Sequence, residues 1–483
     1  MFIHHNRKIL VTGASGYVGG RLVPELVRKG YQVRCMVRNP KVLKARNWPN
    51  IEIVQGDVLK PDTLSAALQN IDTAYYLIHS MGNKSNFEVM DILAAENFGK
   101  TASKAGVSRI IYLGGLAKSS DKLSPHLKSR QTVGKVLRKS GIQVTELRAS
   151  IIIGSGSASF EIIRDLAKKL PIMITPRWVR SNCEPIAIKN VIEYLIGCLE
   201  SSETVGQILE IGGGEIFTYE QMMKIVAELM GKKIIMIPVP LLTSRLSAYW
   251  LNIVTSVPMS IAHPLVEGLR NDSICSDRRI QEWIKLDLLP FKIAVQMALE
   301  NDKKGYLESR WTEASNLPSY SDSAELKEGI FHNKQIIHTD VSREKLFQVI
   351  QKLGGETGWY YANWLWKLRG LLDRMIGGVG MRRGRRHPTD IRIGDPIDFW
   401  RVENYQIGKI LKLRAEMKLS GQAWLEFEVK EAEHNIMTFK QTATFLPANW
   451  FGKLYWYLTI PSHYFIFRKM AKNIVKAAKR EIY

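Results

Sequence analysis

The residues best suited to chemistry stand near the start of the chain, where glycines separate a predicted strand from a predicted helix. Residues 8–11, KILV, predict a buried strand, the run TGASGYVG follows at 12–19, and an amphipathic helix is expected to about residue 29. Such glycines permit a tight turn, let a pyrophosphate approach the backbone, and let the helix pack closely. The helix N-terminus offers free N–H groups and a positive dipole end to phosphates. The pattern predicts a dinucleotide site that includes Thr12, Gly13, Ser15, Gly16, Tyr17 and Gly19.

The residue after the second predicted strand, 32–37, indicates which dinucleotide binds. A dinucleotide with a free ribose 2′-hydroxyl usually meets an acidic residue at this place, whereas this chain has Arg38. A guanidinium pairs well with a 2′-phosphate, and a carboxylate would repel it. Arg34, Lys41 and Lys44 add positive charge nearby. We therefore expect NADP(H) as the cofactor; the alternative is that Arg38 only decorates a surface loop.

The elements that must position these residues alternate between strand and helix. Strands are expected at 51–55, 73–78, 109–113 and 143–147, and helices at 62–68, 88–105 and 126–140. This alternation predicts an α/β, doubly wound parallel sheet of the Rossmann type, with helices on both faces.

Ligands in such a sheet bind beyond the carboxyl ends of the strands. Asp57, next to Val58, is then placed to accept a hydrogen bond from the adenine amino group. The ends of the later strands bring further residues near the nicotinamide: His79, Ser80, Gly114 and Gly115.

The length and the net charge of the chain limit which functions it can have. The 483 residues suffice for two or three domains, and the net charge of +22 favours acidic partners such as phosphorylated cofactors, anionic lipid headgroups or nucleic acid. A basic surface that serves only solubility is the alternative. The four cysteines form no CxxC pair, so no metal site is predicted and a reducing compartment fits. We find neither a signal peptide nor an apolar stretch of about 18 residues, so we expect a cytoplasmic protein, with peripheral membrane contact as an option.

Over roughly residues 7–310 the chain resembles the short-chain dehydrogenase/reductase superfamily. The glycine turn carries this resemblance, together with Gly56-Asp57-Val58 and with Ile211-Gly212-Gly213-Gly214 followed by Thr218-Tyr219. The chain looks like the atypical, NmrA-like branch and is similar to bacterial oxidoreductases of this superfamily that carry a C-terminal DUF2867 domain. The shared stretches are YYLIHSM at 75–81, PHLKSR at 125–130, IIIGSGS at 151–157, TPRW at 175–178 and EGLRN at 267–271.

The chain departs from the superfamily at the catalytic positions. The resemblance implies a Tyr-x-x-x-Lys pair, in which the Tyr donates a proton, and a Ser on the preceding strand. Here His126 and Arg130 stand at the Tyr and Lys positions, and the strand ends in Gly114-Gly115. In one interpretation His126 is the acid, His79 is a second candidate, and Arg130 holds the nicotinamide ribose. In the other, the cofactor binds without turnover.

The region to residue 310 is expected to form a lid over the substrate. Thr218 and Gln221 predict a capping box that opens a helix to about residue 230. Large apolar residues in this region favour a large apolar substrate, although each is also compatible with ordinary core: Phe160, Trp178, Tyr249 and Trp250. The polar segment 311–330 is expected to be a linker between domain 1–310 and domain 331–483.

The second domain is rich in tryptophan. A helix is expected at 341–353, strands at 398–402, 410–418, 423–429 and 436–445, and a basic helix at 469–480. This order suggests an α+β helix-grip fold. The resemblance to DUF2867 implies an SRPBCC-like domain, a class that often encloses apolar ligands; its motifs include GWY at 358–360, GGVG at 377–380 and DFWR at 398–401.

Two features of this domain suggest partners. Arg382, Arg383, Arg385 and Arg386 would form an anion site if they lie on a loop, or would pair with Asp390, Asp395 and Asp398. The aromatic and basic residues from Trp450 onward fit contact with an anionic membrane surface, and equally a helix packed on a sheet. No signature of a nucleic-acid-binding fold is present.

Three functions remain open from the sequence. The chain is an NADPH-dependent reductase of a large apolar carbonyl or quinone-like compound, a non-catalytic NADP(H)-binding regulatory or assembly module, or a carrier of an apolar ligand or lipid.

Overall fold

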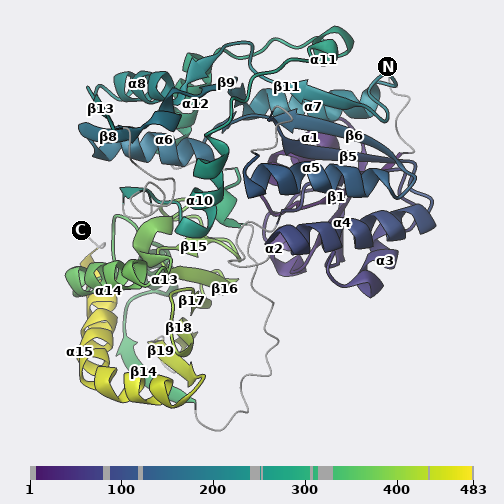
Figure 1. The fold of residues 1–483 in the computed structure, drawn as a ribbon. Helices are drawn as coiled ribbons and strands as arrows, with labels where there is room; N and C mark the ends of the chain where they lie inside the picture. The colour runs from purple at the N-terminus through teal and green to yellow at the C-terminus, as the bar shows by residue number, and fades with distance from the viewer. Residues whose placement is uncertain are drawn as a thin grey trace. The chain divides into compact units, whose positions relative to one another are not determined.

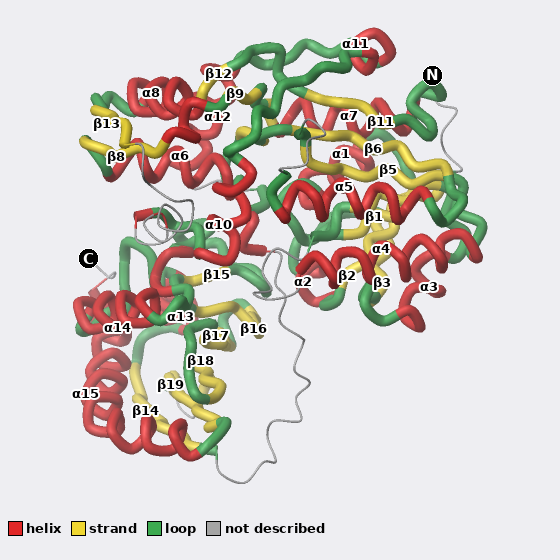
Figure 2. Tube along the Cα trace, in the orientation of Figure 1, coloured by secondary structure: helices red, strands yellow, loops and turns green. Residues whose placement is uncertain are grey.

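The computed structural model describes residues 7–79, 87–117, 123–239, 251, 254–304, 308–313, 330–432 and 436–480 (Figures 1 and 2). The chain divides into two compact units, Met1–Pro318 and Ser319–Tyr483. The division falls inside the segment 311–330 that was interpreted as a linker, of which 314–329 lie outside the described residues.

A seven-stranded parallel sheet forms the centre of the first unit, so the prediction of a Rossmann-type sheet is confirmed. The strand order is β11-β6-β5-β4-β1-β2-β3. The order changes direction between β1 and β4, which places the ligand crevice at the carboxyl ends of these two strands. The strands are β1 (Lys8–Thr12), β2 (Gln32–Val37), β3 (Ile51–Gln55), β4 (Thr73–Tyr76), β5 (Arg109–Gly115), β6 (Gln143–Ala149) and β11 (Ile208–Ile211).

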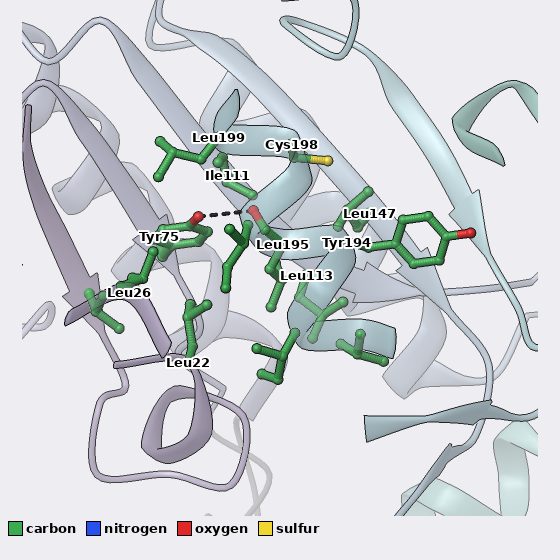
Figure 3. Packing of buried hydrophobic residues seen from close by; sticks show 14 of the residues in the cluster. Leu22, Leu26, Tyr75, Ile111, Leu113, Leu147, Tyr194, Leu195, Cys198 and Leu199 are labelled. Carbon is green, nitrogen blue, oxygen red and sulfur yellow. Dashed lines mark hydrogen bonds between the residues drawn. The ribbon is translucent and has the colours of Figure 1, made fainter. Parts of the chain in front are cut away.

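Helices cover both faces of this sheet because successive strand residues point to opposite sides. Tyr75 of β4 belongs to the apolar cluster with α1 (Gly19–Arg28) and α7 (Ile188–Glu200), and its hydroxyl donates to the Leu195 carbonyl oxygen at 2.9 Å (Figure 3). Tyr76 belongs to the cluster on the other face, with α3 (Leu64–Leu68), α4 (Phe87–Lys104) and α5 (Pro125–Arg138). The remaining helices of this half are α2 (Pro40–Lys44), α11 (Arg279–Trp283) and the single turn η1 (Pro61–Thr63).

The rest of the first unit forms the predicted lid region around a core of its own. The capping box is confirmed: Thr218 accepts from the Gln221 N–H, and the Gln221 side chain accepts from the Thr218 N–H. Phe160 is fully buried in this core and therefore does not line an open site. Tyr249 and Trp250, and the Trp178 side chain, lie outside the described residues. The elements are β7 (Ile152–Ile153), α6 (Ala158–Lys169), β8 (Ile172–Pro176), η2 (Arg177–Arg180), β9 (Asn182–Cys183), β10 (Ile186–Ala187), β12 (Phe217–Thr218), α8 (Tyr219–Leu229), β13 (Ile235–Val239), α10 (Met259–Gly268), α12 (Phe291–Lys303) and η3 (Trp311–Glu313).

The second unit is an α+β domain around a six-stranded antiparallel sheet. Its strand order is β14-β19-β18-β17-β16-β15, and helix α13 (Arg343–Gln351) and helix α15 (Trp450–Arg480) contribute to one core with it. Among the described helices of the chain, none has an apolar stretch long enough to cross a bilayer. The strands are β14 (Phe331–Thr339), β15 (Pro396–Ile397), β16 (Trp400–Gln406), β17 (Ile410–Ala415), β18 (Gly421–Glu431) and β19 (Met437–Pro447).

Three features of this unit differ from the sequence prediction. Strand β14 and helix α14 (Asn363–Met375) were not expected, and α15 begins at Trp450 rather than at residue 469. The strand expected at 398–402 begins two residues later, as β16, because Asp398 has a φ of +54° and lies in the turn between β15 and β16. Alternation of polar and apolar residues is weak in β14, an edge strand that pairs only with β19 among the described strands.

Aromatic side chains fill the interior of the second unit. Trp359 is fully buried and its ring centre lies 5.3 Å from that of Trp366 and 6.2 Å from that of Phe399. Trp366 also contacts Phe467 of α15, at 6.3 Å between ring centres. These rings therefore pack against one another within one core.

The two-faced packing of the first unit predicts which leucines support it. Leu22 is fully buried between α1 and the sheet, whereas Leu93 on α4 is 46% exposed. We expect Leu22→Ala to lower the free energy of unfolding by about 2–5 kcal/mol because it removes buried methyl groups and leaves a cavity. The matched Leu93→Ala should change it by about 0.5 kcal/mol or less. Equal losses in the two variants, measured by urea denaturation, would contradict the packing described.

Candidate dinucleotide and proton-transfer site

At two glycines of the turn, backbone atoms leave no room for a side chain, and at a third the surroundings are more open. Gly13 has a φ of +67°, and a Cβ there would lie 2.6 Å from the Leu77 carbonyl oxygen. A Cβ on Gly19 would lie 2.3 Å from the Gly13 carbonyl oxygen. At Gly16 the one described neighbour within 4 Å is that same oxygen, at 3.2 Å. No side chain caps the N-terminus of α1. The Gly20 and Arg21 N–H groups donate to the carbonyl oxygens of Gly16 and Val18 at 2.9 and 3.1 Å, so this terminus offers an anion mainly the positive end of the helix dipole. This cradle fits a pyrophosphate.

Thr12 and Tyr17, which the motif places at the cofactor, direct their side chains into the protein. The fully buried Thr12 hydroxyl donates to the Tyr75 carbonyl oxygen at 2.9 Å and accepts from the Leu77 N–H at 3.2 Å. The Tyr17 hydroxyl would lie 2.5 Å from a Cβ on Gly154, and burial raises its pKa. Both side chains therefore support the turn, and contact with a cofactor would come from their backbone.

Arg46 belongs to this site although the motif does not include it. Its guanidinium donates to the Ser15 carbonyl oxygen at 2.8 Å and to the Ala14 carbonyl oxygen at 3.4 Å. The same guanidinium lies 4.9 Å from the ring centre of Trp48. Arg46 thus fixes the turn and adds positive charge beside the phosphate cradle. The signal in the sequence was a basic residue shortly after the second strand.

Arg38 and Asp57 lie together at the ends of β2 and β3. Arg38 lies at the surface; partial burial of its guanidinium lowers its pKa, and the nearby Asp57 opposes that shift. One oxygen of the Asp57 carboxylate accepts from the Leu59 N–H at 3.0 Å, which orients the group. Val58 is buried, and its carbonyl oxygen accepts from the Asn97 side chain at 3.0 Å. Contact between Arg38 and the 2′-phosphate of a dinucleotide stays a prediction.

Arg34 does not contribute to this charge, and the expectation that it does is wrong. Its side chain is buried, forms an ion pair with Glu52 at 2.9 Å, and donates to the carbonyl oxygens of Ala67 and Gln69 at 3.0 and 2.8 Å. Arg34 closes the C-terminal end of α3 because the last carbonyl groups of a helix lack partners within it.

His79 and His126, predicted separately, lie against each other. His79 follows β4 and His126 stands in the first turn of α5, yet their ring centres are 5.0 Å apart. Asp91 of α4 lies 2.8 Å from Nδ1 of His79, and its carboxylate also accepts from the Ser129 hydroxyl at 3.3 Å. The hydrogen bond to Asp91 places the His79 proton on Nδ1 and leaves Nε2 as an acceptor. That buried Nε2 has no hydrogen-bond partner among the described residues.

Burial decides the charge of the two imidazoles. It lowers the pKa of His79, although the hydrogen bond to Asp91 opposes the shift. It lowers the pKa of His126 well below the ordinary value, and the neighbouring His79 and Arg130 lower it further. Both rings are therefore neutral at pH 7, and a proton added to the pair is favoured most beside Asp91.

Arg130 stands one helical turn after His126, at the edge of the same group. Its guanidinium lies 5.0 Å from the ring centre of Tyr112 and donates to the Leu113 carbonyl oxygen in β5. The carboxyl end of β5 is thus linked to α5 by this side chain. Its place fits the predicted contact with the nicotinamide ribose, which stays a prediction.

Sequence reasoning missed Asp91, although a signal was present. The buried residues of α4 recur at helical spacing: Asp91, Ala94, Ala95, Phe98, Gly99 and Ala102. A carboxylate within such an apolar stripe is costly to bury unless it has partners. It therefore indicates a partner on a neighbouring element, but which element requires the fold.

The four arginines of the second unit do not form an open loop, which corrects that prediction. Arg386 is buried and forms ion pairs with Asp390 at 2.8 Å and Asp395 at 3.0 Å. Arg383 pairs with Glu416. Arg385 donates to the His387 carbonyl oxygen at 3.0 Å, and burial lowers its pKa to about 10. Burial and the nearby Arg374 lower the pKa of Arg382 to about 10.

Two known families match the chain in the parts that the motifs indicated. Residues 13–169 match the family described as NAD(P)H-binding, and residues 328–470 match a protein family of unknown function, DUF2867. The chain joins an NAD(P)H-binding domain to a DUF2867 domain. The resemblance of the NAD(P)H-binding part to atypical short-chain dehydrogenases is confirmed.

Relatives of the NAD(P)H-binding domain differ in what they do. The chain is 34% identical over 115 residues to a 3 beta-hydroxysteroid dehydrogenase/Delta 5-->4-isomerase of Mycobacterium tuberculosis, covering 22% of this chain and 30% of that protein. It is 24% identical to the chloroplastic divinyl chlorophyllide a 8-vinyl-reductase of Cucumis sativus, covering 47% and 57%. It is 23% identical to the photosystem II assembly factor Ycf39 of Guillardia theta, covering 48% and 73%. The chain thus spans less than two thirds of the first two proteins.

A solved structure has the same fold. The Citrobacter triphenylmethane reductase, complexed with NADP(H), aligns with a TM-score of 0.50 and 21% identity over 60% of this chain and 99% of its own.

The buried histidines predict how stability depends on pH. Below pH 6.5 the unfolded chain binds a proton at His126 and the folded chain does not, so the free energy of unfolding falls as the pH decreases. We expect His126→Asn to reduce this slope by up to about 1.4 kcal/mol per pH unit between pH 6.5 and 5. Urea denaturation across this range measures the slope. Identical slopes in the two proteins would show that His126 is not held neutral in the folded state.

The position of Arg38 predicts the cofactor preference. Arg38→Asp removes a charge-assisted contact to a 2′-phosphate and introduces repulsion, so NADPH affinity should fall by about 10- to 100-fold. NADH affinity should change by about twofold or less, because that cofactor has no 2′-phosphate. Calorimetric titration with both cofactors checks this difference. Undiminished NADPH affinity would contradict the preference for NADP(H).

Proposed function

We propose that this protein is an NADPH-dependent reductase in which the His79–His126 pair supplies the proton. The observation that carries the proposal is the contact between two imidazoles and a buried carboxylate at the crevice where a dinucleotide binds. A buried Asp91 that orients His79 is costly to maintain, and such groups cluster where proton transfer is needed. When bound, the nicotinamide supplies a hydride to one atom of the substrate.

The residues of the chain then provide the matching proton. The pair, neutral at rest, first takes up one proton from solvent. His126, in the first turn of α5, then gives a proton to the atom that becomes negative after hydride transfer, which returns the pair to its neutral state. Nε2 of His79 is an acceptor in the resting state, and Asp91 stabilises the positive charge that the pair gains on protonation. Arg130 holds the nicotinamide ribose, the place that Lys takes in the Tyr-x-x-x-Lys arrangement. His126 replaces the Tyr of that arrangement as acid.

A large apolar substrate is part of the proposal. The names of two relatives, a hydroxysteroid dehydrogenase and a chlorophyllide vinyl-reductase, specify polycyclic substrates. Reduction of an enone, a vinyl group or a quinone needs one hydride and one proton, which the nicotinamide and the histidine pair provide together. The helix-grip and SRPBCC-like character of the second domain stays a prediction, and its aromatic interior gives no support to the carrier function.

A second candidate is an assembly module that binds NADP(H) without turnover. Two observations favour it: the relative called an assembly factor is covered over 73% of its length, and the Tyr-x-x-x-Lys pair is missing. In that case the histidine pair would only support the nucleotide-bound conformation.

The histidine pair separates the two candidates. We expect steady NADPH oxidation with a panel of quinones and polycyclic enones, and His126→Ala should lower kcat by about 100- to 10,000-fold. NADPH affinity should change by about twofold or less, because the phosphate contacts are elsewhere. Asp91→Asn should also lower kcat, since it removes the charge that favours the protonated pair.

His338→Ala is the control, because this exposed histidine lies on the edge strand β14 of the other unit. It should leave kcat and NADPH affinity unchanged. NADPH binding without oxidation of any compound in the panel would favour the assembly module. Turnover that His126→Ala leaves intact would overturn the assigned proton donor.

A further inference from the structure

The second unit exposes aromatic side chains on two helices. All six exposed aromatic residues of the described part of the chain lie on α14 and α15: Trp364, Trp450, Phe451, Tyr457, Tyr464 and Phe465. Exposed aliphatic residues accompany them, among them Leu368, Leu371, Leu372, Met375, Leu454 and Leu458. Soluble monomers seldom expose apolar patches of this kind without a binding role.

On α14 these residues form a single stripe. Trp364, Leu368, Leu371 and Met375 are spaced by three or four positions, so they lie on one face. Trp366 points the other way, into the domain core. The buried residues of α14 are Trp366, Gly370 and Asp373, so most of the large apolar side chains of this helix are left outside, and Trp364 is 67% exposed.

The exposed face of α15 changes character along the helix. Its first part exposes Trp450, Leu454, Leu458 and Phe465, and Leu458 is 73% exposed. Its second part exposes basic residues instead: Arg468, Lys469, Lys472, Lys476, Lys479 and Arg480. Trp450–Arg480 contains no Asp or Glu. Opposite these residues, Met470, Ile474 and Ala478 are buried in the domain core, which fixes which face is outside.

The two helices contact each other through side chains. The Arg369 guanidinium of α14 lies 5.2 Å from the ring centre of Tyr455 in α15, and Trp366 contacts Phe467. Pro461 lies within α15, and the helix changes direction part-way along its length (Figure 1). Along α15 the exposed apolar residues come first and the exposed basic residues follow them.

We propose that the exposed residues of α14 and α15 form a docking surface for an anionic lipid bilayer. Tryptophan and tyrosine favour the boundary between headgroups and acyl chains, and lysine and arginine beside them attract anionic headgroups. The charge of α15 selects this partner over a second copy of the chain, because two such helices would repel each other.

The surface would place the protein at the membrane without crossing it. Its apolar residues would enter to the depth of the headgroups, as interfacial helices do. This inference does not rest on the reductase proposal, because it uses residues of the other unit alone. It also gives an apolar substrate a source, since such compounds concentrate in bilayers.

Vesicle binding tests the surface with the full-length protein. Vesicles of phosphatidylcholine alone and with about 30% phosphatidylglycerol are sedimented with the protein at low and high salt. We expect binding only to the anionic vesicles, weakened by salt because the headgroup attraction is screened. The variant Trp450→Ser, Leu458→Ser, Trp364→Ser should lose at least about 10-fold in affinity. The variant Arg468→Glu, Lys472→Glu, Lys476→Glu should lose at least about 100-fold.

Matched controls distinguish the surface from general charge and hydrophobicity. Ile407→Ser changes a residue that is 77% exposed on another part of the same unit, and Lys304→Glu, Lys334→Glu, Lys409→Glu reverses three exposed lysines outside the two helices. Ile407→Ser should bind the anionic vesicles like the wild type, and the lysine triple variant should keep most of its affinity. All variants should keep NADPH affinity and the thermal midpoint, which shows that they are folded.

Three results would overturn the proposal. One is equal binding to neutral and anionic vesicles. Another is equal loss of binding in the control variants and in the α14 and α15 variants. The third is absence of vesicle binding by the wild type; if sedimentation then shows a dimer that the Trp450 variant dissociates, a second copy covers this surface instead.

Discussion

The site depends on the close approach of the glycine turn to strand β4 and helix α1. The turn has no room for a side chain at Gly13 or Gly19, because the Leu77 and Gly13 carbonyl oxygens occupy those positions. The buried Thr12 hydroxyl ties the end of β1 to β4 through two hydrogen bonds. Since His79 follows β4 directly, the same packing that shapes the phosphate cradle also fixes the first imidazole. The same packing thus positions both the candidate cofactor site and the histidine pair.

The histidine pair contacts a carboxylate that lies in apolar surroundings. Asp91 is buried beside alanines and Phe98, where a charge is costly without partners. His79 and Ser129 provide those partners, and burial keeps both imidazoles neutral. Natural proteins retain such groups where function requires them, at some cost in stability. Protonation of the pair is therefore unfavourable at neutral pH, and it is least unfavourable next to the Asp91 carboxylate.

The second unit distributes its residues in the opposite way. In its interior, tryptophans contact each other, Arg383 pairs with Glu416, and Arg386 pairs with Asp390 and Asp395. Its surface keeps exposed aromatic residues on α14 and α15. Arg383 and Arg386, which the sequence suggests for an anion site, are paired within the protein. Large apolar residues such as Trp364 and Trp450 are exposed. The docking surface proposed for this unit therefore lies on its helices rather than within its sheet.

The sequence by itself determined the glycine turn, the alternating elements and the place of Arg38, because these depend on neighbours along the chain. Turn formation, strand burial and helix capping at Thr218 are local effects, and their residues carry a recognisable spacing. The partnership of Asp91, His79 and His126 depends on three elements that only the folded sheet brings together. The roles of Arg34, Arg383 and Arg386 were likewise decided by tertiary structure, since a charge on a sequence is free or paired according to what packs against it. The same holds for α14, where the sequence does not show that Trp366 is buried against Trp359 and Phe467 while Trp364 is exposed.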